Sequence, residues 1–218
     1  MKISKSLATA AMLVASVGAS ASASAQVTGM MTGAPSSIYM LNLSAPAACT
    51  VGMPCTLGSV GSIVGGTIFS SDQPFADIPK TSPVTAIRFL SSGPTSTSPS
   101  ILTLSGAGLQ NIGFLWGSPD LYNQLNVVSM TGGVSSTQLF TAALLSFPVT
   151  NGNQSFSQYV RFTANAGTMI TGLQFSNLPA TDAFEVANFN TVPEPATYAL
   201  MAAGLAALGL ASKRRKQA

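Results

Sequence analysis

The stretch Phe156-Ser-Gln-Tyr-Val-Arg-Phe-Thr163 decides the fold class, because apolar and polar side chains alternate along it. Phe156, Val160 and Phe162 fall on one side of an extended chain. The opposite side carries Ser157, Tyr159, Arg161 and Thr163, which is the pattern of a half-buried strand. Met169, Thr171, Leu173 and Phe175 repeat the period of two.

Similar short apolar runs recur along the chain, at residues 38–43, 63–69, 84–90, 101–104, 112–116, 125–130, 138–147 and 183–189. Many short strands separated by turn residues predict an all-β fold and not a βαβ fold. We expect a β-sandwich with a jelly-roll-like arrangement, and a barrel is the alternative.

Helical periodicity of any length is confined to the two ends of the chain. Residues 141–145 have the composition of a helical turn, but their β-branched and aromatic neighbours favour a strand. The low-complexity stretch 91–100 predicts a surface loop, at which the strands would divide into two groups. We expect one β-rich domain over residues 26–190.

The N-terminus has the three parts of a secretory signal. Lys2 and Lys5 give a positive start, residues 7–17 are mostly apolar, and Ala23-Ser24-Ala25 precedes Gln26. This small-residue pattern predicts cleavage after Ala25. The apolar run is too short to span a bilayer, so residues 1–25 are interpreted as a cleaved signal helix.

The C-terminus, residues 191–218, combines a short motif, an apolar run and a cluster of cations. Pro193-Glu194-Pro195 precedes an uncharged run over 196–212, which as a helix would measure roughly 26 Å and cross a thin bilayer core. The run is followed by Lys213, Arg214, Arg215 and Lys216, which hold that end in the cytoplasm. A single transmembrane helix over 196–212 is therefore predicted.

The Pro193–Pro195 triplet, the apolar run with Gly204 and Gly209, and the basic end together resemble the PEP-CTERM sorting signal of exosortase substrates. The resemblance implies an exported precursor, anchored in the inner membrane, that an exosortase-type enzyme processes near the triplet. Its implied destination is the cell surface or extracellular matrix, with exopolysaccharide as a partner. A simple C-terminal anchor is the alternative. Such tails are also labelled ice-binding protein C-terminal domains, but the hydroxyl residues here gather in loops and form no regular ladder.

A second resemblance covers about residues 101–190 and implies a β-rich surface domain. Segments 114–123, 158–162 and 183–188 look like a recurring set in exosortase-dependent surface proteins. In that set an Asp is common where this chain has Ala187, so the resemblance implies no ligand role for a carboxylate at that position.

The net charge of +3 comes from the two ends of the chain. Between Gln26 and Val192, three cations and five anions leave a net charge of −2. The exported domain therefore has no basic patch of the kind that binds nucleic acid.

The only cysteines, Cys49 and Cys55, are separated by five residues. In an exported chain they predict a disulfide around a small loop, with metal or redox chemistry as the alternative. Two cysteines without any histidine make a poor zinc site.

The absence of histidine excludes histidine-based triads, dyads and general bases. A glycosidase needs only two carboxyl groups, so Asp120, Asp182 and Glu185 are hydrolase candidates, with Asp72 and Asp77 behind them. The loops 72–77 and 182–188 are candidate calcium-binding sites, although a role in turns is favoured for the acidic residues in them. No other cofactor is expected.

Trp116, Asp120, Tyr122 and Asn123 form the most suggestive binding cluster, in a loop that also contains Gly and Pro. An exposed aromatic face stacks on sugars while Asp and Asn bind hydroxyl groups, which suggests carbohydrate binding. The favoured alternative places Trp116 in the core and a plain turn after it. The sequence as a whole predicts a non-enzymatic surface protein.

Overall fold

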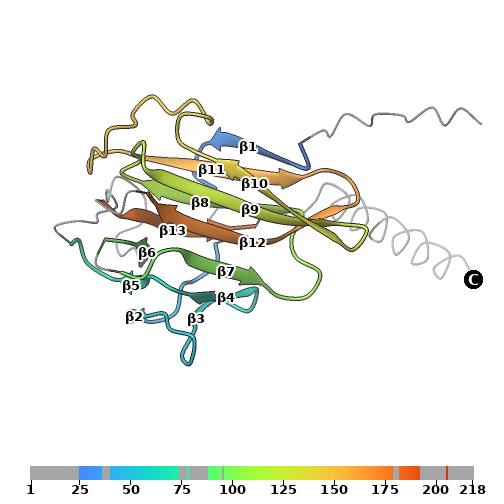
Figure 1. Ribbon diagram of the computed structural model, residues 1–218, viewed down its shortest axis with the longest axis horizontal. Coiled ribbons are helices and arrows are strands. Elements are labelled where there is room, and N and C mark those ends of the chain that lie inside the picture. Colours follow the sequence, from blue (N-terminus) through green and yellow to red (C-terminus); the bar gives the residue numbers. More distant parts are fainter. Residues whose placement is uncertain are drawn as a thin grey trace, which may run out of the picture.

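A computed structural model of the 218-residue chain describes residues 25–35, 40–73, 78, 88–94, 96–178, 182–191 and 205. Between residues 25 and 191 the described part consists of strands, turns and loops without a helix (Figure 1). No helix among the described residues has the length and hydropathy needed to cross a membrane. The predicted signal helix and the helix at 196–212 fall outside the described residues, except for Ala25 and Leu205.

The described strands form two antiparallel sheets. The seven-stranded sheet contains, in spatial order, β1 (Val27–Thr32), β11 (Ser157–Ala164), β8 (Asn111–Gly117), β13 (Phe184–Asn190), β6 (Phe89–Ser92), β5 (Thr67–Phe69) and β2 (Ala47–Ala48). The six-stranded sheet contains β10 (Val134–Phe140), β9 (Asn123–Thr131), β12 (Thr168–Asn177), β7 (Ser100–Leu104), β4 (Gly61–Val64) and β3 (Cys55–Leu57). The all-β prediction is confirmed, and the jelly-roll-like arrangement stays a prediction.

The alternation in β11 gives the expected burial. Val160 and Phe162 are 1% and 0% exposed, whereas Tyr159 and Arg161 keep part of their surface in solvent. Phe162 stacks on Phe114 of β8 with ring centroids 5.7 Å apart. Phe114 also meets Phe175 of β12 edge-on at 5.5 Å, so the two sheets share one apolar core.

The last strand, β13, occupies the centre of the seven-stranded sheet (Figure 1). It pairs with β8 on one side and β6 on the other. Asn190 lies opposite Gly113 of β8, and Val27 lies opposite Ala164 of the neighbouring strand β11. The register of β11 on β8 places both positions at the same end of the sheet. The chain therefore enters and leaves the sheet at one end.

The prediction of a strand over 138–147 is wrong beyond Phe140, where β10 ends. Residues 141–145 form the helical turn that was the less favoured alternative, with Leu145 N donating to Thr141 O at 3.1 Å. The Thr141 hydroxyl also accepts a bond from Leu144 N at 3.2 Å, as a helix-capping threonine does. Ser146 ends the turn with a φ of 59°. Local capping outweighs β propensity here.

The predicted strand over 63–69 is two strands, β4 and β5, which belong to different sheets. Gly65 and Gly66 separate them with φ values of 83° and 77°. A Cβ atom at Gly65 would lie 2.4 Å from the backbone oxygen of Pro99, so only glycine fits this crossing.

Other boundaries also differ from the predictions. Within 40–43 the chain makes only isolated bridges, at Met40 and Leu43, instead of a continuous strand. Described residues of the predicted strand 84–90 begin at Arg88, and β6 begins at Phe89. The predicted loop 91–100 contributes Ser91 and Ser92 to β6 and Ser100 to β7. Strands β1, β2 and β3 were not predicted.

Candidate functional site

The last described strand, β13, ends at Asn190, immediately before the predicted sorting tail. Asn190 is 4% exposed, and its side-chain amide donates to Asn188 O at 3.3 Å. Next to it, Phe189 O accepts a bond from Leu41 N at 2.7 Å. The last strand is thus held by contacts up to its final residue. The predicted motif residues, which are Pro193, Glu194, Pro195, Lys213, Arg214, Arg215 and Lys216, lie outside the described residues.

The described residues begin beside the predicted cleavage point, at Ala25. Gln26, the residue after Ala25, accepts hydrogen bonds through its side-chain oxygen from the hydroxyls of Ser129, at 3.1 Å, and of Ser136. Its backbone oxygen accepts from Asn165 N at 2.9 Å. Ala23 lies outside the described residues. Cleavage after Ala25 would leave these contacts of Gln26 intact.

The predicted binding cluster, Trp116, Asp120, Tyr122 and Asn123, does come together at the end of β8. Trp116 is 0% exposed and stacks on Phe184 with ring centroids 4.4 Å apart. Its indole nitrogen donates to Asn123 Oδ1 at 3.0 Å. The Asp120 carboxylate accepts bonds from Tyr122 N at 2.7 Å and Asn123 N at 2.8 Å. These bonds close a compact Asx turn between β8 and β9.

This geometry removes Trp116 as a sugar-stacking residue, and carbohydrate binding through Tyr122 stays a prediction. Sugar stacking requires an exposed aromatic face, and Trp116 has none. Asn123 is 0% exposed, and its amide nitrogen donates a hydrogen bond to Ala183 O at 3.3 Å. Only Tyr122, at 40% exposure, presents an aromatic ring to solvent in this cluster. The favoured alternative, a core tryptophan followed by a turn, is confirmed.

Two of the hydrolase candidates, Asp120 and Glu185, are buried beside this turn. Their exposed fractions are 4% and 1%. The Ser118 hydroxyl donates to Glu185 Oε2 at 2.7 Å. Burial raises the pKa of Glu185 well above its ordinary value, and nearby Asp120 and Asp182 raise it further although the Ser118 bond opposes the shift. Burial likewise raises the pKa of Asp120, against the two backbone bonds that it accepts.

The fold uses one oxygen of each of these two carboxyl groups, and a hydrolase role stays untested. Asp120 Oδ2 is buried without a hydrogen-bond partner, and Asp120 Oδ1 serves the turn. Asp182 and Asp72 are exposed, and Asp77 lies outside the described residues. Among the described residues, no three His, Cys, Asp or Glu side chains are grouped as metal ligands. Calcium binding stays a prediction.

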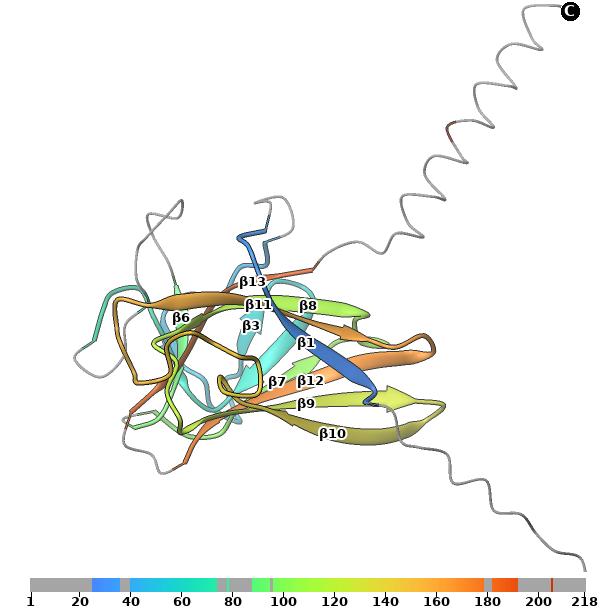
Figure 2. The ribbon, with the colours of Figure 1, turned by 90° about the horizontal axis from the view of Figure 1, so that it is seen from above.

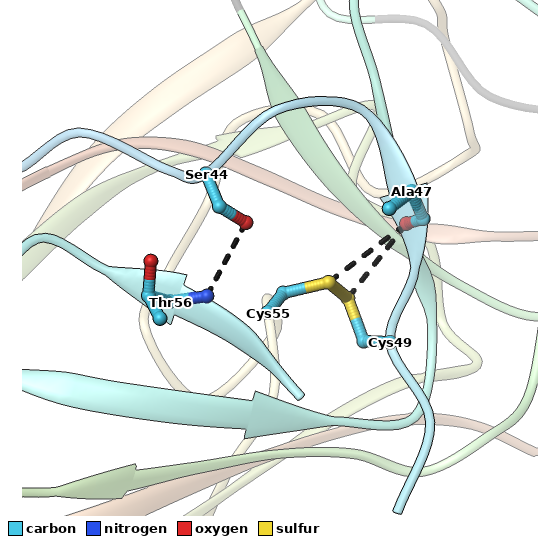
Figure 3. Close-up of a disulfide and its surroundings, with 5 residues drawn as sticks. All are labelled: Ser44, Ala47, Cys49, Cys55 and Thr56. Atoms are coloured by element: carbon cyan, nitrogen blue, oxygen red, sulfur yellow. Dashed lines mark hydrogen bonds between the residues drawn. A yellow bond between two sulfur atoms is a disulfide. The ribbon is translucent and has the colours of Figure 1, made fainter. Parts of the chain in front are cut away.

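The predicted disulfide between Cys49 and Cys55 is present, with both sulfurs close to the backbone oxygen of Ala47 (Figure 3). Both cysteines are buried, at 3% and 4% exposure. Just beyond Cys55, Thr56 N donates to the Ser44 hydroxyl at 3.2 Å. The bridge ties the β2 edge of one sheet to the β3 edge of the other. A loop of this length contributes about 2 kcal/mol to stability.

Ser118, whose hydroxyl donates a hydrogen bond to Glu185, was not predicted from the sequence as a partner of that carboxylate. It follows β8 with a φ of 30°, and Glu185 lies in β13, which pairs with β8. The only local signal is the Gly117-Ser118-Pro119 sequence, which indicates a turn but not the identity of the acid that it meets.

In a comparison with known protein families, residues 191–216 match the PEP-CTERM protein-sorting motif. The match begins at the residue that follows β13. Comparison with curated proteins and with solved structures gave no match.

Proposed function

Since the chain carries a PEP-CTERM sorting motif, which marks exported surface proteins sorted by an exosortase, we propose that residues 26–190 are a non-enzymatic cargo for the cell surface or extracellular matrix. In this proposal residues 196–212 hold the precursor in the inner membrane. The basic residues 213–216 keep its end in the cytoplasm. Processing near Pro193–Pro195 then frees the folded domain.

The observation that carries the proposal is the junction between fold and motif. The domain's last strand ends at Asn190, and the sorting motif starts at residue 191. A cut near Pro193–Pro195 therefore removes no residue of β13. Prolines at both sides of Glu194 favour an extended chain that a membrane enzyme can reach.

The arrangement of the two chain ends supports the same proposal. Val27 and Asn190 lie at one end of the seven-stranded sheet. The export signal and the sorting tail are attached there. A precursor held through its tail would face the membrane with this end. The Trp116–Asn123 turn at the other end would face away.

The non-enzymatic part of the proposal is supported by the state of the carboxyl groups. Glu185 and Asp120 are the best placed pair, and both are buried in contacts with Ser118 and the Asx turn. A substrate sugar would have to displace this turn to reach them. Association with exopolysaccharide is supported by a surface rich in hydroxyl and amide groups and poor in charge.

The test is the substitution Glu194→Ala in the full chain, expressed in its own cells. Glu194 is the only charged residue between Glu185 and Lys213, so we expect the processing enzyme to recognise its carboxylate. The variant should accumulate in the membrane fraction at precursor size, with the released fraction reduced roughly tenfold or more, the loss expected when a buried charged contact is removed. A blot of membrane and released fractions measures this directly.

Asp182→Ala is the matched control. It removes an exposed carboxylate upstream of the motif, and the released fraction should stay at the level of the unaltered chain. Equal release of the Glu194→Ala variant and the unaltered chain would contradict the proposal.

A further inference from the structure

The two sheets end in edge strands of unequal length. Edge strands β2 and β3 contain two and three residues. Edge strands β1 and β10 contain six and seven, on the opposite side of the molecule. Long edges expose backbone N–H and C=O groups to other strands, and proteins usually protect them with charge, proline, bulges or short length. The two long edges differ in this protection.

Strand β1 is protected by polar side chains. Val27 N donates to the Gln138 side chain at 3.3 Å, and Thr32 O accepts a bond from the Gln158 side chain at 3.0 Å. The positive guanidinium of Arg161 lies against Met30, with Nη2 3.5 Å from Sδ. Gln138 reaches β1 from β10, whereas Gln158 and Arg161 reach it from the paired strand β11, so polar groups and one charge lie beside β1.

Strand β10 is less protected, although its Gln138 side chain ties it to Val27 of β1. Its sequence, Val134-Ser-Ser-Thr-Gln-Leu-Phe140, contains no charge and no proline. It pairs with β9 in continuous register, without a bulge. Among the described residues, the backbone of β10 makes no hydrogen bond with a side chain or loop, and its only backbone partner is β9. Among the described residues no strand pairs with its outer edge, and β10 is the outermost strand of its sheet (Figure 2).

Apolar side chains are exposed around the same edge. Leu139 is 46% exposed and Val134 is 70% exposed. Met130, which lies opposite Ser135 on β9, is 42% exposed. None of the six strands of this sheet contains a charged residue, so no charge opposes the approach of a similar surface. The edge combines unpaired backbone groups with an uncharged, partly apolar margin.

We propose that β10 pairs antiparallel with β10 of a second copy of this chain. In the pairing centred on Thr137, the exposed Thr137 side chains of the two copies lie opposite each other. Leu139 then lies opposite Ser135 of the second copy, and Ser135 opposite its Leu139. A two-fold pairing of this kind closes as a dimer and leaves no long edge free at β10.

The experiment uses the full chain with Thr137→Cys. Both native cysteines are in the disulfide, so the new thiol has no partner within its own chain. On a non-reducing gel the variant should run as a covalent dimer that reduction converts to monomer. Thr103→Cys is the matched control, because Thr103 is equally an exposed threonine on the same sheet but lies on the interior strand β7.

Thr137→Lys gives an independent measurement. Two lysines facing each other at the two-fold axis should weaken dimerisation on the order of tenfold or more, and Thr103→Lys should not. Sedimentation of the detergent-solubilised full chain measures both. Equal cross-linking at Thr103 and Thr137, or a dimer whose dissociation constant is unchanged by Thr137→Lys, would overturn the proposal. A monomeric unaltered chain would overturn it as well.

Discussion

Strand β13 and the sorting motif follow one another in the chain, but they depend on the rest of the molecule to different degrees. Phe184–Asn190 is a strand because β8 and β6 flank it on both sides, and both partners come from much earlier in the sequence. The motif at 191–216 is contiguous and is recognised from its linear sequence. A strand that depends on residues distant in the sequence is therefore followed directly by a motif made of consecutive residues.

The difference separates the two sources of information about function. In the domain, the polar groups that suggested a binding site are used by the fold, as the bond from Trp116 to Asn123 shows. The motif consists of consecutive residues, so we expect its recognition not to depend on whether the domain is folded. The domain is expected to be stable without the tail, and in the proposed function processing of the tail releases the domain.

The largest expected effect comes from cutting the chain on either side of β13. A chain ending at Thr191 should keep cooperative unfolding, because every described strand is retained. A chain ending at Ala183 should lose its fold, since removal of β13 exposes β8 and β6 and opens the core around Phe184 and Phe189. Circular dichroism with thermal unfolding measures both. A chain ending at Ala183 that still folds would contradict the claim that the domain requires β13.

A smaller effect is expected from Trp116→Ala, which empties a buried site and leaves Asn123 without its indole donor. The free energy of unfolding should fall by about 3–5 kcal/mol. Tyr122→Ala in the same turn should cost no more than about 1 kcal/mol, because the ring is exposed. Denaturant unfolding gives both values. Equal losses for the two variants would contradict the core role of Trp116.

The smallest effect concerns pH. The folded pKa of Glu185 lies above its ordinary value of 4.5, so the folded state holds a proton that the unfolded chain has lost. Its contribution to stability is complete below about pH 4.5 and is lost as pH rises through the folded pKa. The free energy of unfolding should fall by up to about 1.4 kcal/mol for each pH unit in that window. Asp120 acts in the same direction.

Glu185→Gln sharpens this prediction. The amide oxygen can still accept the Ser118 bond, but the side chain no longer ionises, so the slope with pH should flatten and stability at neutral pH should rise. Asp72→Asn removes an exposed carboxylate that is not among the groups raising the pKa of Glu185, so it is the control and should leave the slope unchanged. Unfolding curves between about pH 4 and about pH 8 test it. An unaltered slope in Glu185→Gln would contradict the assignment.

Patterns within a few residues predicted part of this structure. The alternation in 156–163 predicted β11 and its buried face, and the spacing of Cys49 and Cys55 predicted their bridge. Both depend on neighbours in the chain, which the sequence displays directly. Where two local preferences competed, as at 141–145, propensity favoured a strand while the Thr141 hydroxyl stabilised a turn.

Partners that meet through strand pairing could not be predicted. Ser118 reaches Glu185 because β8 and β13 are neighbours, and a shift of one residue in their register would separate them. The burial of Trp116 depends on Phe147 and Phe184, which approach it from other parts of the chain. The short strands β2 and β3 contain too few residues to show any period.

The central claim is that a membrane enzyme cuts the chain just after the fold ends, and mass spectrometry of the protein recovered from the surface of its own cells tests it most directly. The account predicts a chain that starts at Gln26 and ends near Pro193–Pro195. A mature chain that still contains the apolar residues 196–212 and the cations 213–216 would contradict it.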